Sequence, residues 1–553
     1  MALPVGDLVY VITIFILFFK VVTRIDVPTE IDPTTMGLEK SVTEPGFITC
    51  NNNWLYENEF GLWEMYLEGG PLELGALHGL LAEQLVQKQE DAFVNQIKVM
   101  IPSESYLKFL KYFIGWFNKD LDEYIKHEYL LEIYGVSAFA SENYGFIGPK
   151  YNRILNYHAA HDIGHALQNL SLVECTAFGV WDEMSSDSGL LIGRNFDFYV
   201  GDEFAENKII AFIDPEDGYK FASVTWAGMI GVVSGMNEKG LTISLNSAKS
   251  EIPFGARTPV SIIAREILQY ASTIEEAIAI ASARKSFVSE SFLIGSAIDH
   301  KSVVIEKSTD TTVLFDPGYN HIILTNHFQS DYFMKDELNI ENIENETSLY
   351  RHERVQEMLA ENMRIDHSLA ADILRDRRGK GDRNIGNGNE KAINQLIAHH
   401  SIIFKPESLQ LWISTSPWQV GEYLCYDLDS IFKSPGIRDT QNILYNSSLQ
   451  IPADSFLTDD EYLDFINFKT LLGEVQAATR DGIELTDEQD IINELVQSNP
   501  EYFHIYFAIG KYYESRGNLE LATKYFNLAM SKEVASSSEK EKIQQAIKDC
   551  LTE

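Results

Sequence analysis

The middle of the chain is a long run of short strand-like segments, and this pattern restricts the fold more than any other. Between Thr176 and Phe432, apolar stretches such as GLLIGRNFDF and GLTISLNSA alternate with turns that contain glycine and asparagine. Two helical patterns, TPVSIIAREILQYA and TIEEAIAIASA, interrupt the run. Strands in one block and helices in others are typical of an α+β protein, whereas a doubly wound parallel sheet alternates them regularly. We therefore predict an α+β fold.

Helical patterns flank this region on both sides. Residues 25–174 carry apolar side chains at helical spacing in PLELGALHGLLAEQLVQKQEDAF and SESYLKFLKYFIGWFNKDLDEYI, which predicts a mainly helical segment. Residues 433–553 are also predicted to be helical. The expected organisation is an N-terminal segment over 1–24, the helical segment, a central domain over 175–432 and the helical C-terminal region.

One unit of the C-terminal region, near residues 502–535, is similar to a tetratricopeptide repeat. Large, small and turn residues stand at the offsets of that helical hairpin: Tyr506, Ile509, Gly510, Tyr513, Gly517, Leu519, Ala522, Phe526 and Ala529. A single repeat cannot bury its own apolar face, so we expect it to pack on DEQDIINELVQS and SEKEKIQQAIKDCL. A packing role is expected, and a groove for a protein partner is the alternative.

The first 24 residues differ in composition from the rest. The uncharged run Leu8–Phe19 is followed by Lys20 and Arg24, and Leu3–Thr23 would reach spanning length if Asp7 and Lys20 extend to the interface. A secretory signal is the alternative, although this segment lacks an early basic residue and a small-residue cleavage site. We predict a membrane anchor. Positive charges after the run favour a cytoplasmic body, but two charges leave the exported side open as well.

Charge and cysteine content exclude several classes of protein. The net charge of −38 disfavours nucleic acid as a partner, because phosphate binding requires clustered Lys and Arg. Cys50, Cys175, Cys425 and Cys550 show neither a CxxC motif nor regular spacing. The sequence therefore predicts neither a disulfide framework nor a cysteine zinc site.

Cys175 opens the strand-like stretch CTAFGVW, and the next strand ends in GRNFDF, which carries Arg194 and Asp197. An antiparallel pair joined by the turn DEMSSDSG would place both residues beside Cys175. A neighbouring guanidinium favours the nucleophilic thiolate, and a carboxylate can accept a hydrogen bond from an amine. The alternative is a buried structural cysteine, which is the commoner role of a free thiol.

Other polar residues stand at the ends of predicted elements. In SGMNEKGLTISLNSA, NEKG forms a hairpin turn and Asn246 ends the second strand, where an amide can donate to an oxyanion. Asn326 ends the strand in HIILTNHF. SLYRHERVQEML opens a helix that carries Arg351 and Arg354.

In this order, the motifs resemble the N-terminal-nucleophile hydrolases of the bile-salt hydrolase (choloylglycine hydrolase) and penicillin-acyltransferase group. The similarity covers Cys175 to Phe432, with a looser match at GGPLELGALHGLLAEQ. It implies a four-layer αββα sandwich, no cofactor, and cleavage or transfer of acyl groups at amide bonds. It also implies a set of site residues: the nucleophile Cys175, with Arg194 and Asp197 beside it, the oxyanion donor Asn246, Asn326 lining the site, and Arg351 near the nucleophile.

In this family the nucleophile becomes an N-terminus, so residues before Cys175 resemble a pro-segment that is separated by self-cleavage between Glu174 and Cys175. The released α-amine, with an ordinary pKa of about 7.7 to 8.0, would serve as the general base. The sequence departs from the family pattern at Glu174, where the acyltransferase branch more often has glycine. We expect the larger acidic residue to slow the acyl shift. The turn between Cys175 and Arg194 is also longer than in the bile-salt branch.

The sequence thus predicts an autoproteolytic cysteine amidohydrolase or acyltransferase. Its partner would be a small N-acyl amide or acyl thioester that forms an acyl-enzyme on Cys175. An acyl-CoA-dependent N-acyltransferase that uses the same site is one alternative. A non-catalytic, membrane-tethered helical scaffold is the other.

A histidine cluster provides a lower-ranked metal-site alternative. His158, His161 and His165 in YHAAHDIGHALQ would share one face of a helix, with Asp162 adjacent. The simpler interpretation is a helix face whose histidines pack in the pro-segment, so no metal is expected.

Overall fold

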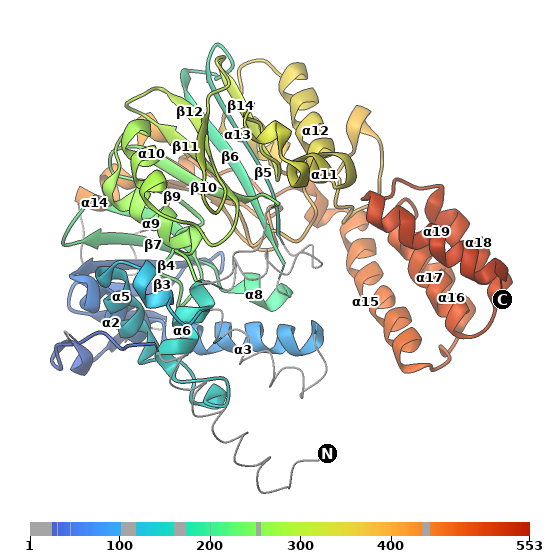
Figure 1. Ribbon diagram of the computed structural model, residues 1–553, viewed down its shortest axis with the longest axis horizontal. Helices are drawn as coiled ribbons and strands as arrows, with labels where there is room; N and C mark the ends of the chain where they lie inside the picture. The colour runs from blue at the N-terminus through green and yellow to red at the C-terminus, as the bar shows by residue number, and fades with distance from the viewer. Residues whose placement is uncertain are drawn as a thin grey trace, which may run out of the picture.

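The computed structural model shows two β-sheets packed face to face between layers of helices, with a further group of helices at the C-terminus (Figure 1). It describes residues 25–29, 31–44, 46–100, 115, 118–159, 173–199, 201–249, 256–433 and 443–552. The predicted membrane anchor lies outside these ranges. Within them, no helix is both long enough and apolar enough to cross a membrane.

The larger sheet contains eleven strands among the described residues. In spatial order they are β1 (Ser41–Glu44), β2 (Phe47–Cys50), β3 (Asn53–Glu57), β4 (Trp63–Gly69), β7 (Ile209–Pro215), β8 (Phe221–Thr225), β9 (Ser234–Asn237), β10 (Leu241–Ser247), β11 (Glu290–Ser296), β12 (Lys301–Lys307) and β13 (Thr312–Phe315). Strands β4 and β7 pair in parallel, and the other neighbours pair antiparallel. The β9–β10 pair is the hairpin that the NEKG turn predicted.

The smaller sheet carries the predicted nucleophile. In spatial order its strands are β14 (His321–Leu324), β5 (Val173–Asp182), β6 (Ser188–Phe198), β15 (His400–Lys405), β16 (Gln410–Ser414) and β17 (Tyr423–Asp427). All of these neighbours pair antiparallel. The β5–β6 pair confirms the predicted hairpin around DEMSSDSG.

Three apolar clusters hold the layers together. Ile192 of β6 and Phe212 of β7 belong to the cluster between the two sheets. On the outer face of the larger sheet, Ile243 clusters with side chains of α2 (Pro71–Leu81), α9 (Val260–Tyr270) and α10 (Ile274–Ala283). On the outer face of the smaller sheet, Phe178 clusters with side chains of α12 (Ser348–Glu361) and α13 (His367–Leu374). This arrangement confirms the predicted four-layer αββα sandwich.

The region before Cys175 is not helical throughout. It contains the predicted helices, namely α2, α3 (Glu83–Met100), α5 (His127–Ser137) and α6 (Lys150–His158). Strands β1 to β4 precede them and were not predicted, because the amphipathic stretches that follow dominate the sequence pattern. Since β4 pairs with β7, the segment before the nucleophile is part of the larger sheet. Most of the helix expected over 103–125 lies outside the described residues.

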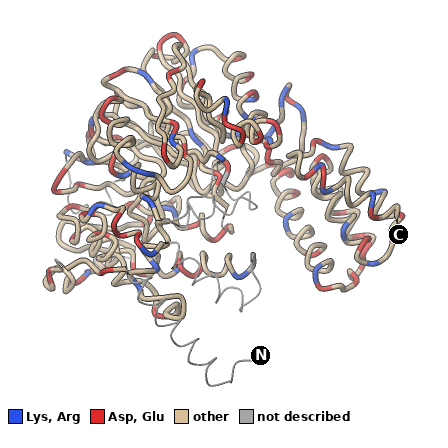
Figure 2. Tube along the Cα trace, viewed as in Figure 1, with Lys and Arg blue, Asp and Glu red and all other residues tan. Residues whose placement is uncertain are grey.

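Three further short helices are described in the central part of the chain. They are α8 (Asp202–Glu206), α11 (Glu337–Asn345) and α14 (Leu428–Lys433). Lys and Arg are scattered among the more numerous Asp and Glu along the described trace (Figure 2).

The C-terminal region consists of α15 (Asp460–Asp481), α16 (Glu488–Ser498), α17 (Phe503–Ser515), α18 (Leu519–Met530) and α19 (Ser537–Thr552). Helices α17 and α18 form the expected hairpin, and α16 and α19 share its apolar cluster. A Cβ at Gly510 would lie 2.4 Å from the Phe526 ring, so the hairpin requires a very small residue there. Its relation to tetratricopeptide repeats, and any protein partner, stay predictions.

Helices α2 and α5 cross at two glycines, Gly75 and Gly135. A Cβ at Gly75 would lie 1.9 Å from the carbonyl oxygen of Glu132, so Gly75→Ala would push the helices apart. We expect the free energy of unfolding to fall by about 1–3 kcal/mol, as measured by urea denaturation. Gly473→Ala in α15 is the matched control. No heavy atom lies within 4 Å of its added Cβ. Because Ala has a higher helix propensity than Gly, the free energy of unfolding should stay unchanged or rise slightly. Equal effects at the two sites would contradict the packing argument.

Candidate active site

Cys175 lies near the start of β5, with no solvent exposure. The β5–β6 register sets Glu174 opposite Asp197, Cys175 opposite Phe196, and Ala177 opposite Arg194. Across this pair, Nη2 of Arg194 donates to Sγ of Cys175 at 3.6 Å. The hairpin therefore brings the thiol and the guanidinium into contact, as the sequence predicted.

The thiol is electrostatically held in its protonated form in the intact chain. Burial raises the pKa of Cys175 to about 12, against the lowering effect of the nearby Arg194. The carboxyl groups of Asp197 and Glu290 raise it further, and Arg351 lowers it. A thiol with this pKa is a poor nucleophile at neutral pH unless a neighbouring group takes up its proton.

Asp197 is buried, and neither of its carboxyl oxygens has a hydrogen-bond partner among the described residues. Burial raises its pKa to about 8, while Arg351 lowers the pKa, Glu174 raises it and Arg194 lowers it. A buried polar group without a partner is unfavourable. Asp197 can therefore accept a hydrogen bond from any donor that appears beside Cys175.

Asn326 and Arg351 hold the main chain of Cys175 from the other side. The amide nitrogen of Cys175 donates to Oδ1 of Asn326 at 2.9 Å, and Nη2 of Arg351 donates to the same oxygen at 2.8 Å. Nη1 of Arg351 donates to the carbonyl oxygen of Cys175 at 2.6 Å and to Oγ1 of Thr176 at 2.9 Å. These contacts fix both the nitrogen and the carbonyl of the predicted nucleophile.

The side-chain amide of Asn246 donates to main-chain carbonyls in the intact chain. Asn246 lies one residue before the end of β10, which packs near β5, and it is buried. Its Nδ2 donates to the carbonyl oxygens of Leu324 and Thr325, both at 3.2 Å. Within the described part of the chain, its Oδ1 has no hydrogen-bond partner. Both amide hydrogens therefore hold the end of β14, and the oxyanion role stays a prediction.

A chain of polar groups that no sequence motif indicated lies behind Arg194. Nη1 of Arg194 donates to Oγ of Ser234 at 2.6 Å, and Nε2 of His400 lies 2.9 Å from the same oxygen. Nδ1 of His400 lies 2.9 Å from Nδ1 of His399. Burial lowers the pKa of His399 to about 3 and that of His400 well below its ordinary value, so both rings are neutral. The guanidinium also lies 4.3 Å from the centre of the Phe196 ring, so it is held on several sides.

His158 is a packing residue in α6. Its Nδ1 lies 2.8 Å from the carbonyl oxygen of Ile154, and its Nε2 accepts from the amide of Ile230 at 3.0 Å. Both ring nitrogens therefore have main-chain partners. His161 and His165 lie outside the described residues. Within the ranges that the structure covers, no group of three His, Cys, Asp or Glu side chains is arranged to hold a metal ion.

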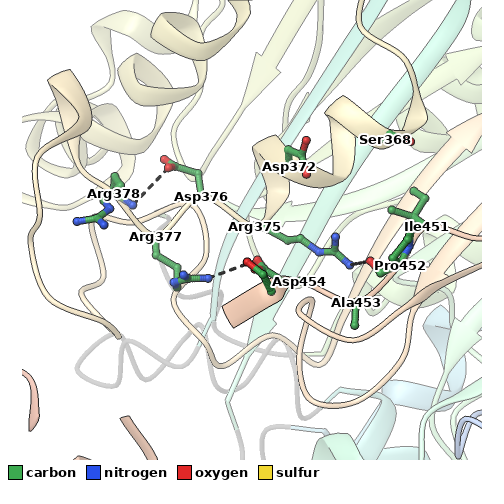
Figure 3. A pocket seen from close by; sticks show the side chains of 11 residues that line it. Ser368, Asp372, Arg375, Asp376, Arg377, Arg378, Ile451, Pro452, Ala453 and Asp454 are labelled. Atoms are coloured by element: carbon green, nitrogen blue, oxygen red, sulfur yellow. Dashed lines mark hydrogen bonds and ion pairs between the residues drawn. The ribbon is translucent and has the colours of Figure 1, made fainter. Parts of the chain in front are cut away.

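One pocket is separate from these residues. A pocket of about 480 Å³ lies between the end of α13 and the segment before α15 (Figure 3). It is lined by Ser368, Asp372, Arg375, Asp376, Arg377, Arg378, Ile451, Pro452, Ala453, Asp454 and Ser455. Arg375 donates to the carbonyl oxygen of Pro452 at 2.9 Å, and Arg377 pairs with Asp454 at 3.4 Å (Figure 3). The lining contains no nucleophile from the predicted set.

A smaller cavity, of about 40 Å³, lies between the helices before Cys175 and the central domain. Its wall includes Tyr157 and His158 from α6 and the rings of Phe198 and Trp226. Phe198 stacks on Trp226 and on Phe196, the residue opposite Cys175. A continuous row of aromatic side chains thus joins this mainly apolar cavity to the strand pair that carries the thiol.

Comparison with known proteins relates the central domain to one family. Residues 184–416 match the family model described as acyl-coenzyme A:6-aminopenicillanic acid acyl-transferase. The match supports the relation to the N-terminal-nucleophile hydrolases. The matched range starts after Cys175, and it contains the other predicted site residues: Arg194, Asp197, Asn246, Asn326 and Arg351.

Two curated relatives and two solved structures are also similar to the chain. An uncharacterized protein of Archaeoglobus fulgidus is 26% identical over 45% of this chain and 44% of its own, and protein dcd1B of Dictyostelium discoideum is 24% identical over 50% and 58%. The chain thus spans about half the length of these relatives. A Caenorhabditis elegans ortholog of N-acylethanolamine-hydrolyzing acid amidase is 19% identical over 42% of this chain and 93% of its own, with a TM-score of 0.30. A mutant conjugated bile acid hydrolase of Clostridium perfringens is 17% identical over 46% of this chain and 93% of its own, with a TM-score of 0.33.

The raised pKa of Asp197 predicts a pH-dependent stability. An unfolded Asp ionises near pH 3.9, whereas the folded carboxyl stays protonated until about pH 8. Its folded form therefore loses about 1.4 kcal/mol of stability per pH unit as the pH rises between these values. The test uses urea denaturation at several pH values in a Cys175→Ala background. The free energy of unfolding of Asp197→Asn, relative to that of its parent, should rise with pH by this amount per pH unit. The exposed Asp331→Asn is the control, and a flat difference for Asp197→Asn would contradict the burial argument.

Proposed function

We propose that this protein is an N-terminal-nucleophile cysteine hydrolase or acyltransferase. It would act on small N-acyl amides or acyl thioesters through an acyl-enzyme on Cys175. The observation that carries the proposal is the convergence of Arg194, Asn326 and Arg351 on Cys175 at the start of β5. The four-layer fold and the family match over 184–416 support the same reaction class, namely amide hydrolysis or acyl transfer.

Self-cleavage would create the general base. Sγ of Cys175 attacks the carbonyl carbon of Glu174, the bond from that carbon to the nitrogen of Cys175 breaks, and the thiol proton passes to the nitrogen. Water then hydrolyses the thioester, which leaves a carboxylate on Glu174 and a free thiol and α-amine on Cys175. Asn326 already accepts a hydrogen bond from this nitrogen, and the unpartnered carboxyl of Asp197 is available for a second. The α-amine would thus supply the hydrogen-bond partner that Asp197 lacks among the described residues.

The same groups would then serve substrate turnover. The neutral α-amine takes the proton from Sγ, and Arg194 stabilises the thiolate that attacks the acyl carbonyl. The α-ammonium returns the proton to the leaving amine, which breaks the scissile bond and leaves a thioester on Cys175. Water completes hydrolysis, whereas an acceptor amine completes acyl transfer. For Asn246 to stabilise the oxyanion, one of its amide hydrogens must turn away from Leu324 or Thr325.

The substrate's acyl group is proposed to be apolar. The row formed by Phe196, Phe198 and Trp226 leads from the strand pair of Cys175 to the small cavity of about 40 Å³, whose lining is mainly apolar. Because the matched family is named for an acyl-coenzyme A donor, an N-acyltransferase with a thioester donor is the second candidate. Membrane association through residues 1–24, on either side of the membrane, remains part of the proposal.

Substitution of the thiol tests the assignment. Cys175→Ala should abolish turnover of a panel of N-acyl amino acids, N-acyl amides and acyl thioesters, because the variant lacks the thiol that is proposed to carry the acyl group. Cys425→Ala is the matched control, since Cys425 is equally buried and lies in the same sheet on β17. It should keep most of the turnover. Turnover that survives in Cys175→Ala would contradict the proposed function.

A pair of asparagines tests the oxyanion role. Asn246→Ala should lower kcat by roughly 10²–10³-fold, the usual effect of removing one oxyanion donor. Asn237 is a matched control because its Nδ2 also donates to two main-chain carbonyls, those of Leu268 and Ala271, elsewhere in the sheet. Asn237→Ala should lower the melting temperature and leave kcat close to that of the wild type. If the two variants lose kcat equally, Asn246 is a structural residue only.

A further inference from the structure

The side chain of Glu174, directly before the proposed cleavage bond, occupies a site built for a carboxylate. Its Oε2 accepts from Oγ1 of Thr347 at 3.0 Å and from Nε2 of Gln395 at 2.9 Å. Nη2 of Arg351 lies 3.2 Å from the same oxygen. Thr347, Arg351 and Gln395 are all buried, and we call these three residues the Glu174 cradle.

Two elements far apart in the sequence form the cradle. Thr347 is the N-cap residue of α12, but its hydroxyl makes no capping bond and instead donates to Glu174. Arg351 stands one turn into the same helix, where the positive end of the helix dipole also favours a carboxylate. Gln395 belongs to the loop before β15.

Contacts with the C-terminal helical region hold that loop in place. The amide of Asn387 donates to Oδ1 of Asn499 at 3.0 Å, and Nδ2 of Asn499 donates back to the carbonyl oxygen of Asn387 at 2.7 Å. Lys391 forms an ion pair with Glu533 at 2.6 Å. Gln395 therefore reaches Glu174 from a fixed support.

The cradle and the thiol lie on opposite sides of the strand, because successive side chains of a strand alternate between its faces. The cradle holds Glu174 on one side, while Asn326 and Arg351 hold the amide nitrogen and the carbonyl of Cys175. Arg351 takes part in both sets of contacts. The peptide bond between Glu174 and Cys175 is thus fixed at both of its residues.

We propose that the carboxylate of Glu174 is a recognition element for self-cleavage, which the cradle binds in order to position the Glu174 carbonyl for attack by Sγ of Cys175. This inference rests on the self-cleavage described under the proposed function. It reverses the expectation that an acidic residue at this position slows the acyl shift. The chemistry is unchanged: the thioester forms as the peptide bond breaks, and water releases Glu174 with its new carboxylate.

The test is a double-mutant cycle on the rate of self-cleavage. Full-length chains are made by cell-free synthesis, and the fraction of the two-chain form is followed by gel electrophoresis and intact mass. Glu174→Ala should slow cleavage roughly 10- to 100-fold, which corresponds to the loss of charge-assisted hydrogen bonds. Gln395→Leu should slow the wild-type chain by roughly 10-fold. It should cause no further slowing when Glu174 is already Ala, because the two residues act through one contact.

Controls separate recognition from folding. Glu183→Gln, an exposed glutamate just past the end of β5, should cleave at the wild-type rate, whereas Glu174→Gln should be slow. In the Cys175→Ala background, Glu174→Gln should keep its cooperative thermal unfolding, which shows that the slow variant is folded.

Two results would overturn the inference while self-cleavage itself still stands. One is cleavage of Glu174→Ala at the wild-type rate. The other is equal slowing by Gln395→Leu with and without Glu174. An active wild-type protein that stays a single chain would instead contradict the self-cleavage under the proposed function, and this inference with it.

Discussion

The guanidinium of Arg351 joins the parts of the structure on which the site depends. It is fully buried and lies within hydrogen-bonding distance of the main-chain carbonyl of Cys175, the hydroxyl of Thr176, the amide oxygen of Asn326 and the carboxylate of Glu174. A buried charge is tolerated only when it is paired and hydrogen-bonded, so these acceptors and the guanidinium require one another. Through this one side chain, α12 fixes the start of β5, where the thiol and the proposed cleavage bond meet.

The segment before Cys175 is built into the central domain. Strand β4 pairs with β7 along its whole length, and Leu77 of α2 shares an apolar cluster with Ile243 of β10. Cleavage after Glu174 would therefore leave the two chains associated through a sheet and a core. The Glu174 cradle adds a link to the C-terminal helices, because Gln395 stands on the loop that Asn499 and Glu533 hold.

Local patterns were sufficient to predict much of this fold. Alternating apolar residues and the turns DEMSSDSG and NEKG identified the β5–β6 and β9–β10 hairpins, because a tight turn determines which strand pairs next. Strands β1 to β4 were missed, because they join the larger sheet only through the pairing of β4 with β7, which is formed across a long stretch of chain. Cys175, Arg194 and Asp197 could be grouped because they share one hairpin. Ser234, His400, Thr347 and Gln395 could not, because tertiary packing alone brings them to the site.

The central claim is that self-cleavage makes Cys175 a new N-terminal residue, and that the same residue is the nucleophile of turnover. Intact-mass analysis of the active protein, quenched with acid during reaction with a slowly hydrolysed N-acyl substrate, tests both parts at once. The account predicts a fragment that begins at Cys175 and carries one acyl group, and a separate fragment that ends at Glu174. An active protein that consists of one uncleaved chain, or an acyl group on any other residue, would contradict it.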